Sequence, residues 1–454
     1  MRASLRMRRF GSDLSEADEE NSMHIPSFAD LASSTVTALL RDIPLPQMAP
    51  VTQHYQRPQV KDVEAEVSRL LRQNGCLARL QKGQTVAITA GSRGITNLPL
   101  ILRTIVREVK AVGGIPFLVP AMGSHGGASA EGQIKLLKGL GIDEETVEAP
   151  IKSSMETSVI GTTARGMPVH MDAHAAAADA VIAVNRIKPH TSYRGAIESG
   201  VVKMLAIGLG KQKGAETCHA CGYASMSENV AALGEVVLDC KNVLCGIAIL
   251  ENAFHDTASI HVLNPENMIS SETELLREAW RLFPKIFFDA LDVLVIDEIG
   301  KDISGTGFDC NVVGRYHNPH AYGGPNIKRL AILDITDKSK GNGNGIGMAD
   351  AISRRAYDKF SPEQSYPNAL TATATLSVNL PMVFATDQLA IQACIKVCGT
   401  QNPKDIRLVR IKNTIDMAQI YVSEALETYC REHPNIEITE KFTAFAFNAD
   451  GNLW

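Results

Sequence analysis

The stretch that decides the fold is "QTVAITAGSRGITNLPLILRTIVREVKAVGG", residues 84–114. Its segment Val86 to Thr89 is a short apolar run, which indicates a buried strand, and a glycine-containing turn follows directly. Apolar residues then recur at helical spacing until Gly113 and Gly114 end the pattern. This order of strand, loop and helix is typical of an α/β protein with a parallel sheet.

The same order recurs along the chain. "IPFLVPAMGSHGG" (115–127) predicts a second buried strand with its own loop, and the next segment (129–142) predicts a helix. "ADAVIAVNRIKPHT" (178–191) predicts a further strand that ends in a loop. "LDVLVIDEIGKDISGTGFD" (291–309) repeats the plan in the second part of the chain. We therefore expect two α/β domains with parallel-type sheets, and glycine loops that face an interdomain cleft holding the site.

The sequence predicts three segments. Residues 1–25 are basic and then acidic with no apolar stretch, so we expect a disordered tail without a signal peptide. Residues 26–287 are expected to form an N-terminal α/β domain that carries the candidate site histidines and lysine. Residues 288–454 are expected to form a C-terminal α/β domain that closes the cleft.

Composition limits the function classes. The 454 residues are 45% hydrophobic and 21% charged, and their net charge of −5 gives no reason to expect nucleic acid or an anionic membrane as partner. No apolar run reaches the roughly 18 residues that suggest a membrane span. Nine scattered cysteines suit reduced thiols, so we expect a cytoplasmic protein. The oligomeric state stays open.

Two loops that follow strands carry candidate groups. Gly91, Ser92 and Arg93 offer backbone N–H groups, a hydroxyl and a guanidinium, which suit a phosphate or carboxylate. The structural alternative is a tight turn with an exposed arginine. His125 lies between glycines, which leave its imidazole uncovered, as a proton-transfer group requires.

Three further residues stand out. His190 follows a proline, which disfavours helix just before it and indicates a loop. Lys203 is the lone amine in the apolar run "ESGVVKMLAIGLG", where burial would favour its neutral, nucleophilic form. The alternative is a lysine that extends from a buried element to solvent. Lys301 lies on the glycine-rich loop after the strand of the second part, where an open α/β sheet presents its site.

"CHAC" (218–221) raises the question of a zinc or redox centre. Zinc would need a second ligand pair, and the nearest candidate, "HNPH" (317–320), has no cysteine. A thioredoxin-like pair would open a helix after the first strand, which is not the context here. We therefore regard His219 as an isolated nitrogen ligand.

Together these motifs resemble the lactate racemase family, whose members use a nickel-pincer nucleotide. The resemblance rests on "AGSRG", "MGSH", "KPH" followed by glycine-rich sequence, and "GKDISGTGFD". It implies that Lys203 forms a thioamide with the cofactor and that His219 completes the coordination of nickel. It further implies that His125 and His190 exchange protons with the substrate. Arg93 would orient substrate or cofactor, and Lys301, Gly91 and Ser92 would lie along the cofactor.

The resemblance implies a racemase or epimerase that acts on a 2-hydroxy acid by hydride transfer, with cofactor-synthesis proteins as partners. Two departures point to a branch whose substrate is not lactate. The loop between His190 and Lys203 is longer than in lactate racemase, and glycine follows His125. Two alternatives remain open. One is a metal-dependent hydrolase or lyase with His125, His190 and Asp309 as direct ligands, and the other is a non-catalytic nucleotide-binding homologue.

Overall fold

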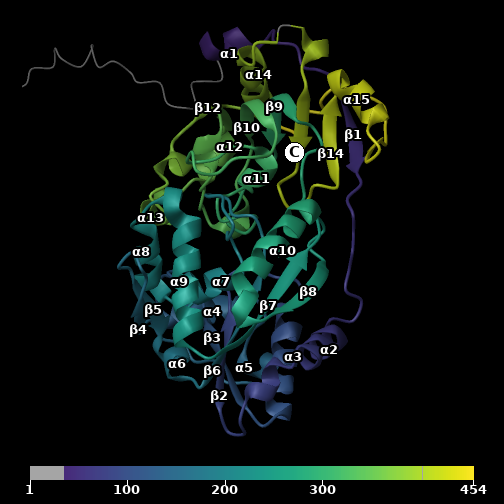
Figure 1. Cartoon of the computed structure of the whole chain (residues 1–454). Coiled ribbons are helices and arrows are strands. Elements are labelled where there is room, and N and C mark those ends of the chain that lie inside the picture. Colours follow the sequence, from purple (N-terminus) through teal and green to yellow (C-terminus); the bar gives the residue numbers. More distant parts are fainter. Residues whose placement is uncertain (1–34, 401) are drawn as a thin grey trace, which may run out of the picture.

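A computed structural model describes residues 35–400 and 402–454, and the expected tail of residues 1–25 lies outside this part of the chain. Figure 1 shows two bodies of mixed helices and strands, one above the other. The chain is α/β, as the sequence predicts. We call the part built on the first sheet the first half (residues 54–289). The rest is the second half (residues 35–53 and 290–454).

The first half is built on a five-stranded sheet, in which three consecutive pairs of strands are parallel and the last pair is antiparallel. Its order is β3 (Ile115–Pro120), β2 (Thr85–Ala90), β6 (Ala180–Arg186), β7 (Val243–Glu251) and β8 (Thr257–Leu263). A separate antiparallel hairpin consists of β4 (Thr157–Thr162) and β5 (Pro168–Asp172). The expected strands and the glycine-ended helix after β2 are therefore confirmed.

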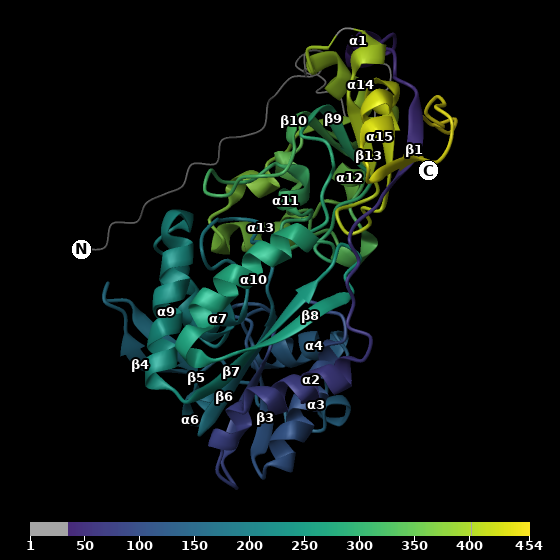
Figure 2. The same cartoon turned by 45° about the vertical axis from the view of Figure 1, so that its right-hand side comes forward.

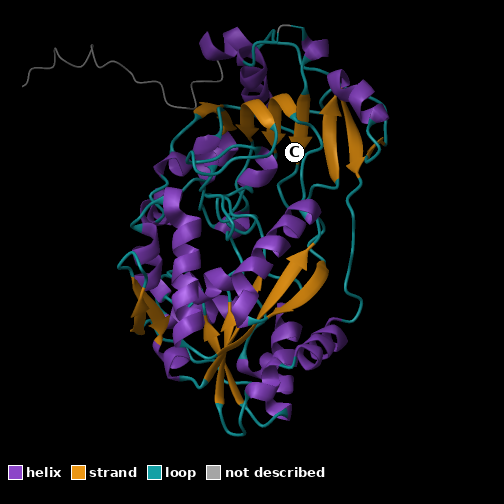
Figure 3. Cartoon of the chain, in the orientation of Figure 1, coloured by secondary structure: helices purple, strands orange, loops and turns teal. Residues whose placement is uncertain are grey.

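The first sheet is buried on both faces, because Ala87 and Val86 of β2 face two different apolar clusters. Helices cover these faces (Figure 3). They are α2 (Val63–Asn74), α3 (Leu98–Ala111), α4 (Ala130–Gly139), α5 (Glu144–Val147), α6 (Ala173–Ala177), α7 (Val201–Lys203), α8 (Lys211–His219), α9 (Met226–Cys240) and α10 (Met268–Leu282). Ser129 caps α4, since its hydroxyl accepts a hydrogen bond from the Gly132 N–H.

The second half is built on an eight-stranded sheet with a parallel part and an antiparallel part. The parallel strands, in order, are β12 (Met382–Phe384), β11 (Ala351–Ser353), β10 (Asn326–Ile332), β9 (Ala290–Ile296) and β13 (Leu408–Ile411). The antiparallel strands are β14 (Gln419–Ser423), β1 (Met48–Gln53) and β15 (Ile436–Ile438). The helices are α1 (Thr35–Leu40), α11 (Cys310–Val313), α12 (Arg354–Lys359), α13 (Pro362–Thr371), α14 (Asp387–Val397) and α15 (Glu427–Glu432).

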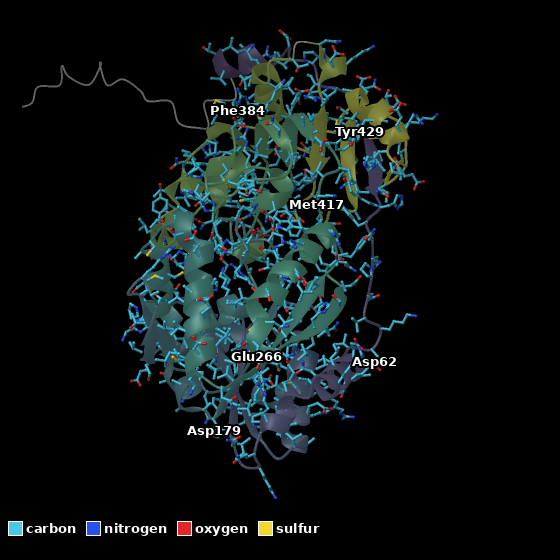
Figure 4. All side chains as sticks on the ribbon, viewed as in Figure 1. Asp62, Asp179, Glu266, Phe384, Met417 and Tyr429 are labelled. Atoms are coloured by element: carbon cyan, nitrogen blue, oxygen red, sulfur yellow. The ribbon has the colours of Figure 1, made fainter. Side chains whose placement is uncertain are left out.

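The position of strand β1 differs from the one that the expected division of the chain gives it. The N-terminal domain was expected to begin at residue 26, whereas β1 pairs with β14 and β15 of the second sheet. Gln53 fixes its end, because its Nε2 donates to the carbonyl of Met417 at 2.8 Å. Met417 is labelled in Figure 4. We therefore propose that the two halves as defined here are the domains, with the N-terminal strand inside the second.

The polypeptide consequently passes between the halves twice, through residues 54–62 and through residues 283–289. The first passage runs along the edge of the molecule in Figure 2, below β1. The two passages contact each other, because the Tyr55 ring stacks on Phe287 with 5.1 Å between centroids. The Tyr55 hydroxyl also donates to the Lys285 carbonyl, and burial raises the pKa of Tyr55 above its usual range.

Within the described ranges, no helix combines the length and the apolar character needed to cross a bilayer.

A candidate active site between the two halves

A cavity of about 780 Å³ lies between the two halves. Loops that follow the carboxyl ends of β2, β3 and β6 line one side, and the loop after β9 lines the other. This is the edge at which parallel α/β sheets bind ligands. All eight residues singled out from the sequence line the cavity: Gly91, Ser92, Arg93, His125, His190, Lys203, His219 and Lys301. The chain thus brings together groups that are far apart in sequence, while their roles stay predictions.

Lys203 ends α7 and is followed at once by a π-helical turn, Met204–Gly208. Such turns are rare and often occur at functional sites. Burial lowers the pKa of Lys203 to about 8. No described residue forms a hydrogen bond or salt bridge with its amine, whose nearest aromatic neighbour is Tyr193 at 5.8 Å. With that pKa, roughly a tenth of the amine is neutral at about pH 7, far more than for an ordinary lysine.

The position of α7 depends on a buried acid, Glu272 of α10. Its carboxylate accepts a hydrogen bond from the Val202 N–H at 2.9 Å, and burial raises its pKa to about 7. Gly200 permits this approach, because a Cβ atom there would lie 2.2 Å from the carboxylate. Any larger residue at position 200 would displace either Glu272 or the helix that carries Lys203.

His125 is oriented by Ser92, whose hydroxyl is hydrogen-bonded to the ring Nδ1. When Nδ1 donates to this hydroxyl, Nε2 keeps a lone pair and can accept a proton. Burial, together with the positive charges of Arg93, Lys301 and Lys203, lowers the pKa of His125 to about 3. The imidazole is therefore neutral at ordinary pH, which is the state a base requires.

A buried network of polar side chains holds the His125 loop in place. Gln133 donates to the carbonyls of Gly123 and His125 at 3.0 and 3.3 Å. Lys211, fully buried, donates in turn to Gln133 at 3.0 Å and forms an ion pair with Asp172 at 3.2 Å. Since Lys211 begins α8, the network connects the His125 loop to the helix that ends at His219.

His190 is held by its own loop. Its N–H donates to the Glu198 carboxylate at 2.6 Å, and its ring stacks on Tyr193 with 4.2 Å between centroids. The Ser192 N–H donates to Nδ1 at 3.1 Å, so the neutral ring carries its proton on Nε2. His190 thus presents a donor, and it can accept a proton at Nε2 only after it gives up the Ser192 contact. Burial lowers its pKa well below the usual value.

His219, the last residue of α8, faces the edge of Tyr223 with 6.1 Å between ring centroids. Burial lowers its pKa, and no described residue forms a hydrogen bond with its ring. The two cysteines of the "CHAC" motif do not pair. Cys218 is buried against the sulfur of Met226, and Cys221 is exposed beside Met167. Neither thiol lines the cavity.

The cavity carries unneutralised positive charge. Arg93 has no carboxylate partner among the described residues, and burial beside Arg186 lowers its pKa. It packs against Gly305 of the second half, where a Cβ atom would lie 2.8 Å from the guanidinium. Among the described residues, the side-chain amine of Lys301 donates only to the Gly305 carbonyl, at 2.8 Å, and burial lowers its pKa to about 8. Arg186, in contrast, pairs with Glu251. Free cations at this position suit an anionic ligand.

Two further residues shape the cleft and were not recognised as site residues from the sequence. His317 lines the cavity from the second half. Arg194 connects the halves, because its guanidinium donates to the Tyr322 carbonyl, to Asn311 and to the Tyr316 hydroxyl. Both depend on contacts between distant segments, which a sequence pattern does not display.

Asp309 does not join the histidines as a ligand would. It pairs with Lys188 at 2.7 Å, and its other oxygen accepts the Asn311 N–H at the start of α11. No group of three or more His, Cys, Asp or Glu side chains in residues 35–400 and 402–454 is arranged to hold a metal ion. A hydrolase that uses His125, His190 and Asp309 as direct ligands therefore finds no preformed site here.

Comparisons with known proteins agree with the resemblance found in the sequence. Residues 37–231 match the model of the lactate racemase N-terminal domain. No curated protein sequence matches the chain significantly. Among solved structures, the chain is similar to the lactate racemase apoprotein from Thermoanaerobacterium thermosaccharolyticum. The identity is 14% and the TM-score 0.49, over 81% of this chain and 94% of that one. Over residues 37–231 the chain is therefore similar to the N-terminal domain of lactate racemases, and this match covers less than half of the 454 residues.

Proposed function

We propose that this protein is a racemase or epimerase of a 2-hydroxy acid, acting with a nickel-pincer nucleotide. One observation carries the proposal: an unpaired amine, Lys203, and the imidazoles of His125, His190 and His219 line the same cavity. We place the reaction in the cytoplasm and expect cofactor-synthesis proteins as partners. A non-catalytic homologue that only binds a nucleotide would have no use for imidazoles held in the neutral state.

The described residues fit this cofactor. A buried lysine with a lowered pKa suits covalent attachment, and His219 offers an imidazole that no protein group occupies. Imidazole is a suitable ligand for nickel. The cavity, about 780 Å³, is of a size that holds a nucleotide-sized ligand beside a small acid. When bound, a nickel-pincer nucleotide supplies an acceptor for hydride from the carbinol carbon of the substrate.

The protein's own groups supply binding and proton transfer. Arg93 and Lys301 bind the carboxylate of the substrate, since both line the cavity and neither has a carboxylate partner among the described residues. A histidine takes the hydroxyl proton as the carbinol hydrogen leaves, and a planar keto acid results. Return of the carbinol hydrogen to the opposite face of that carbon, with the proton to its oxygen, would give the other enantiomer. A proton-exchanging group is needed on each side, and we assign these roles to His125 and His190.

The test is racemisation in deuterated water by protein produced with the cofactor-synthesis enzymes. We expect interconversion of the enantiomers of a 2-hydroxy acid with little deuterium at the carbinol carbon, because the hydrogen travels as hydride. Mass spectrometry of the product measures the incorporation. Rapid incorporation would indicate a carbanion route, and no turnover of any 2-hydroxy acid would contradict the assignment.

We expect His219→Ala to weaken nickel retention while the covalent mass addition persists, because the imidazole supplies one of several bonds to the metal. Nickel content by elemental analysis and intact-protein mass measure the two effects. The matched control is Cys218→Ala combined with Cys221→Ala, which removes the neighbouring thiols. Nickel loss in the control, with His219→Ala unchanged, would reverse this assignment.

A further inference from the structure

His317 is a buried imidazole that no protein group satisfies. The residue is only 7% exposed, and neither Nδ1 nor Nε2 has a hydrogen-bond partner among the described residues. A buried polar group without a partner is unfavourable, and such groups in native proteins call for an explanation. His317 lines the same cavity as His190 and His219, from the opposite half. Both ring nitrogens are also shielded from solvent, and only a group in direct contact with the ring can pair with them.

The loop that carries His317 is docked firmly on the His190 loop. Asn318 donates to the Ser192 carbonyl at 3.0 Å, and the Arg194 N–H donates to the His320 carbonyl at 3.2 Å. The His317 ring faces the edge of Tyr223, with 5.9 Å between centroids. His317 therefore lines the cavity beside the loop that carries His190, and it shares Tyr223 as a ring neighbour with His219.

The protonation state of His317 defines what it can bind. An imidazole is neutral at about pH 8 even with its ordinary pKa, and burial lowers the pKa of His317 to about 4. A neutral ring offers one N–H donor and one acceptor nitrogen. A hydroxyl group, which both donates and accepts, matches such a ring. A carboxylate only accepts, and an alkyl group does neither.

The neighbouring His320 of the same "HNPH" motif is exposed and does not line the cavity, so His317 is the imidazole that this loop presents there. A hydroxyl group on a ligand would match both the donor and the acceptor of its neutral ring.

We propose that His317 is a substrate-binding residue that pairs with a hydroxyl group on the side chain of the 2-hydroxy acid. The inference rests on the proposed function and narrows its substrate class to acids with a second hydroxyl beside the reacting carbon. Lactate, whose side chain is a methyl group, would leave both nitrogens of His317 unpaired.

The test compares glycerate with lactate, which differ by one hydroxyl. We expect the cofactor-loaded protein to show a kcat/KM for glycerate about 10- to 100-fold above that for lactate. His317→Phe keeps a ring of similar shape without nitrogens, and it should remove this preference because it lowers kcat/KM for glycerate by a larger factor than kcat/KM for lactate. His317→Gln, which offers a donor and an acceptor, should restore part of it. His320→Ala is the matched control from the same loop, and it should leave kcat/KM unchanged for both glycerate and lactate.

Binding separates this inference from the proposed function. Dissociation constants for glycerate and lactate are measured by calorimetry on the same proteins, with or without turnover. If neither acid is racemised, the proposed function is in question, while the ratio of the dissociation constants still decides the role of His317. Wild-type protein that binds glycerate no more tightly than lactate overturns the inference. The inference would also be overturned if His317→Phe weakened the binding of both acids equally, or if it lost nickel. Either result would mean that His317 supports the cofactor or the fold.

Discussion

Lys203→Ala is expected to abolish covalent cofactor attachment, and with it bound nickel and all racemisation. The reason is that the Lys203 amine lines the cavity, has a pKa lowered to about 8 and has no hydrogen-bond or salt-bridge partner among the described residues. Attachment therefore depends on this one nitrogen. Intact-protein mass should show no addition for the variant, and elemental analysis should show no nickel. The wild type, produced together with the cofactor-synthesis enzymes, should show both.

Two control variants make this result specific. Lys213→Ala removes an exposed lysine of α8 and should leave the mass addition intact. Lys203→Arg keeps a cation at the position but cannot form the same bond, so it should behave like the alanine variant. If Lys203→Ala still shows the mass addition, the cofactor is attached to another lysine.

The second large effect concerns the proton-exchanging histidines. Replacing either His125 or His190 by alanine should lower the racemisation rate by about 10²–10⁴-fold, because each turnover needs a proton-exchanging group on both faces of the substrate. The half-reaction should distinguish them. In a single turnover, His125→Ala and His190→Ala should form keto acid from opposite enantiomers.

The enantiomer preference is measured by following keto acid formed from each pure enantiomer. His54→Ala, which removes an exposed histidine paired with Glu437 at the surface, serves as the control and should match the wild type. Variants that retain the same preference would show that the two imidazoles do not act on opposite faces. Because the pKa of His125 is lowered to about 3, its loss of function on acidification should begin only well below the ordinary pKa of histidine.

Local patterns predicted the first half of the molecule well. The strand at residues 86–89 and the helix that follows it are short-range features, set by apolar spacing and by glycine, and the structure contains both as β2 and α3. Lys203 could be singled out because one charge stands in an apolar run. The π-helical turn beside it has no such signature, since the surrounding packing determines it.

Long-range pairing explains what the sequence did not reveal. Strand β1, with the sequence "MAPVTQ", contains a proline and lacks a clear alternation, and its partners lie near the other end of the chain. His317 lies in a short polar motif, and only the docking of its loop on Ser192 and Arg194 makes it buried. A buried histidine without partners becomes visible only in three dimensions.

The double passage of the chain between the halves also sets how the molecule can move. Residues 54–62 and 283–289 are the two connections between the halves, and they contact each other through the stacked rings of Tyr55 and Phe287. We therefore expect them to act together as one hinge. Two covalent links side by side suppress sliding and twisting, and they leave swinging about one axis as the easy motion. We expect the cleft to open by such a swing, which would separate Arg93 from Gly305 and break the Arg194 contacts. Closure would then return Lys301 and His317 of the second half to the same positions opposite the histidines of the first half.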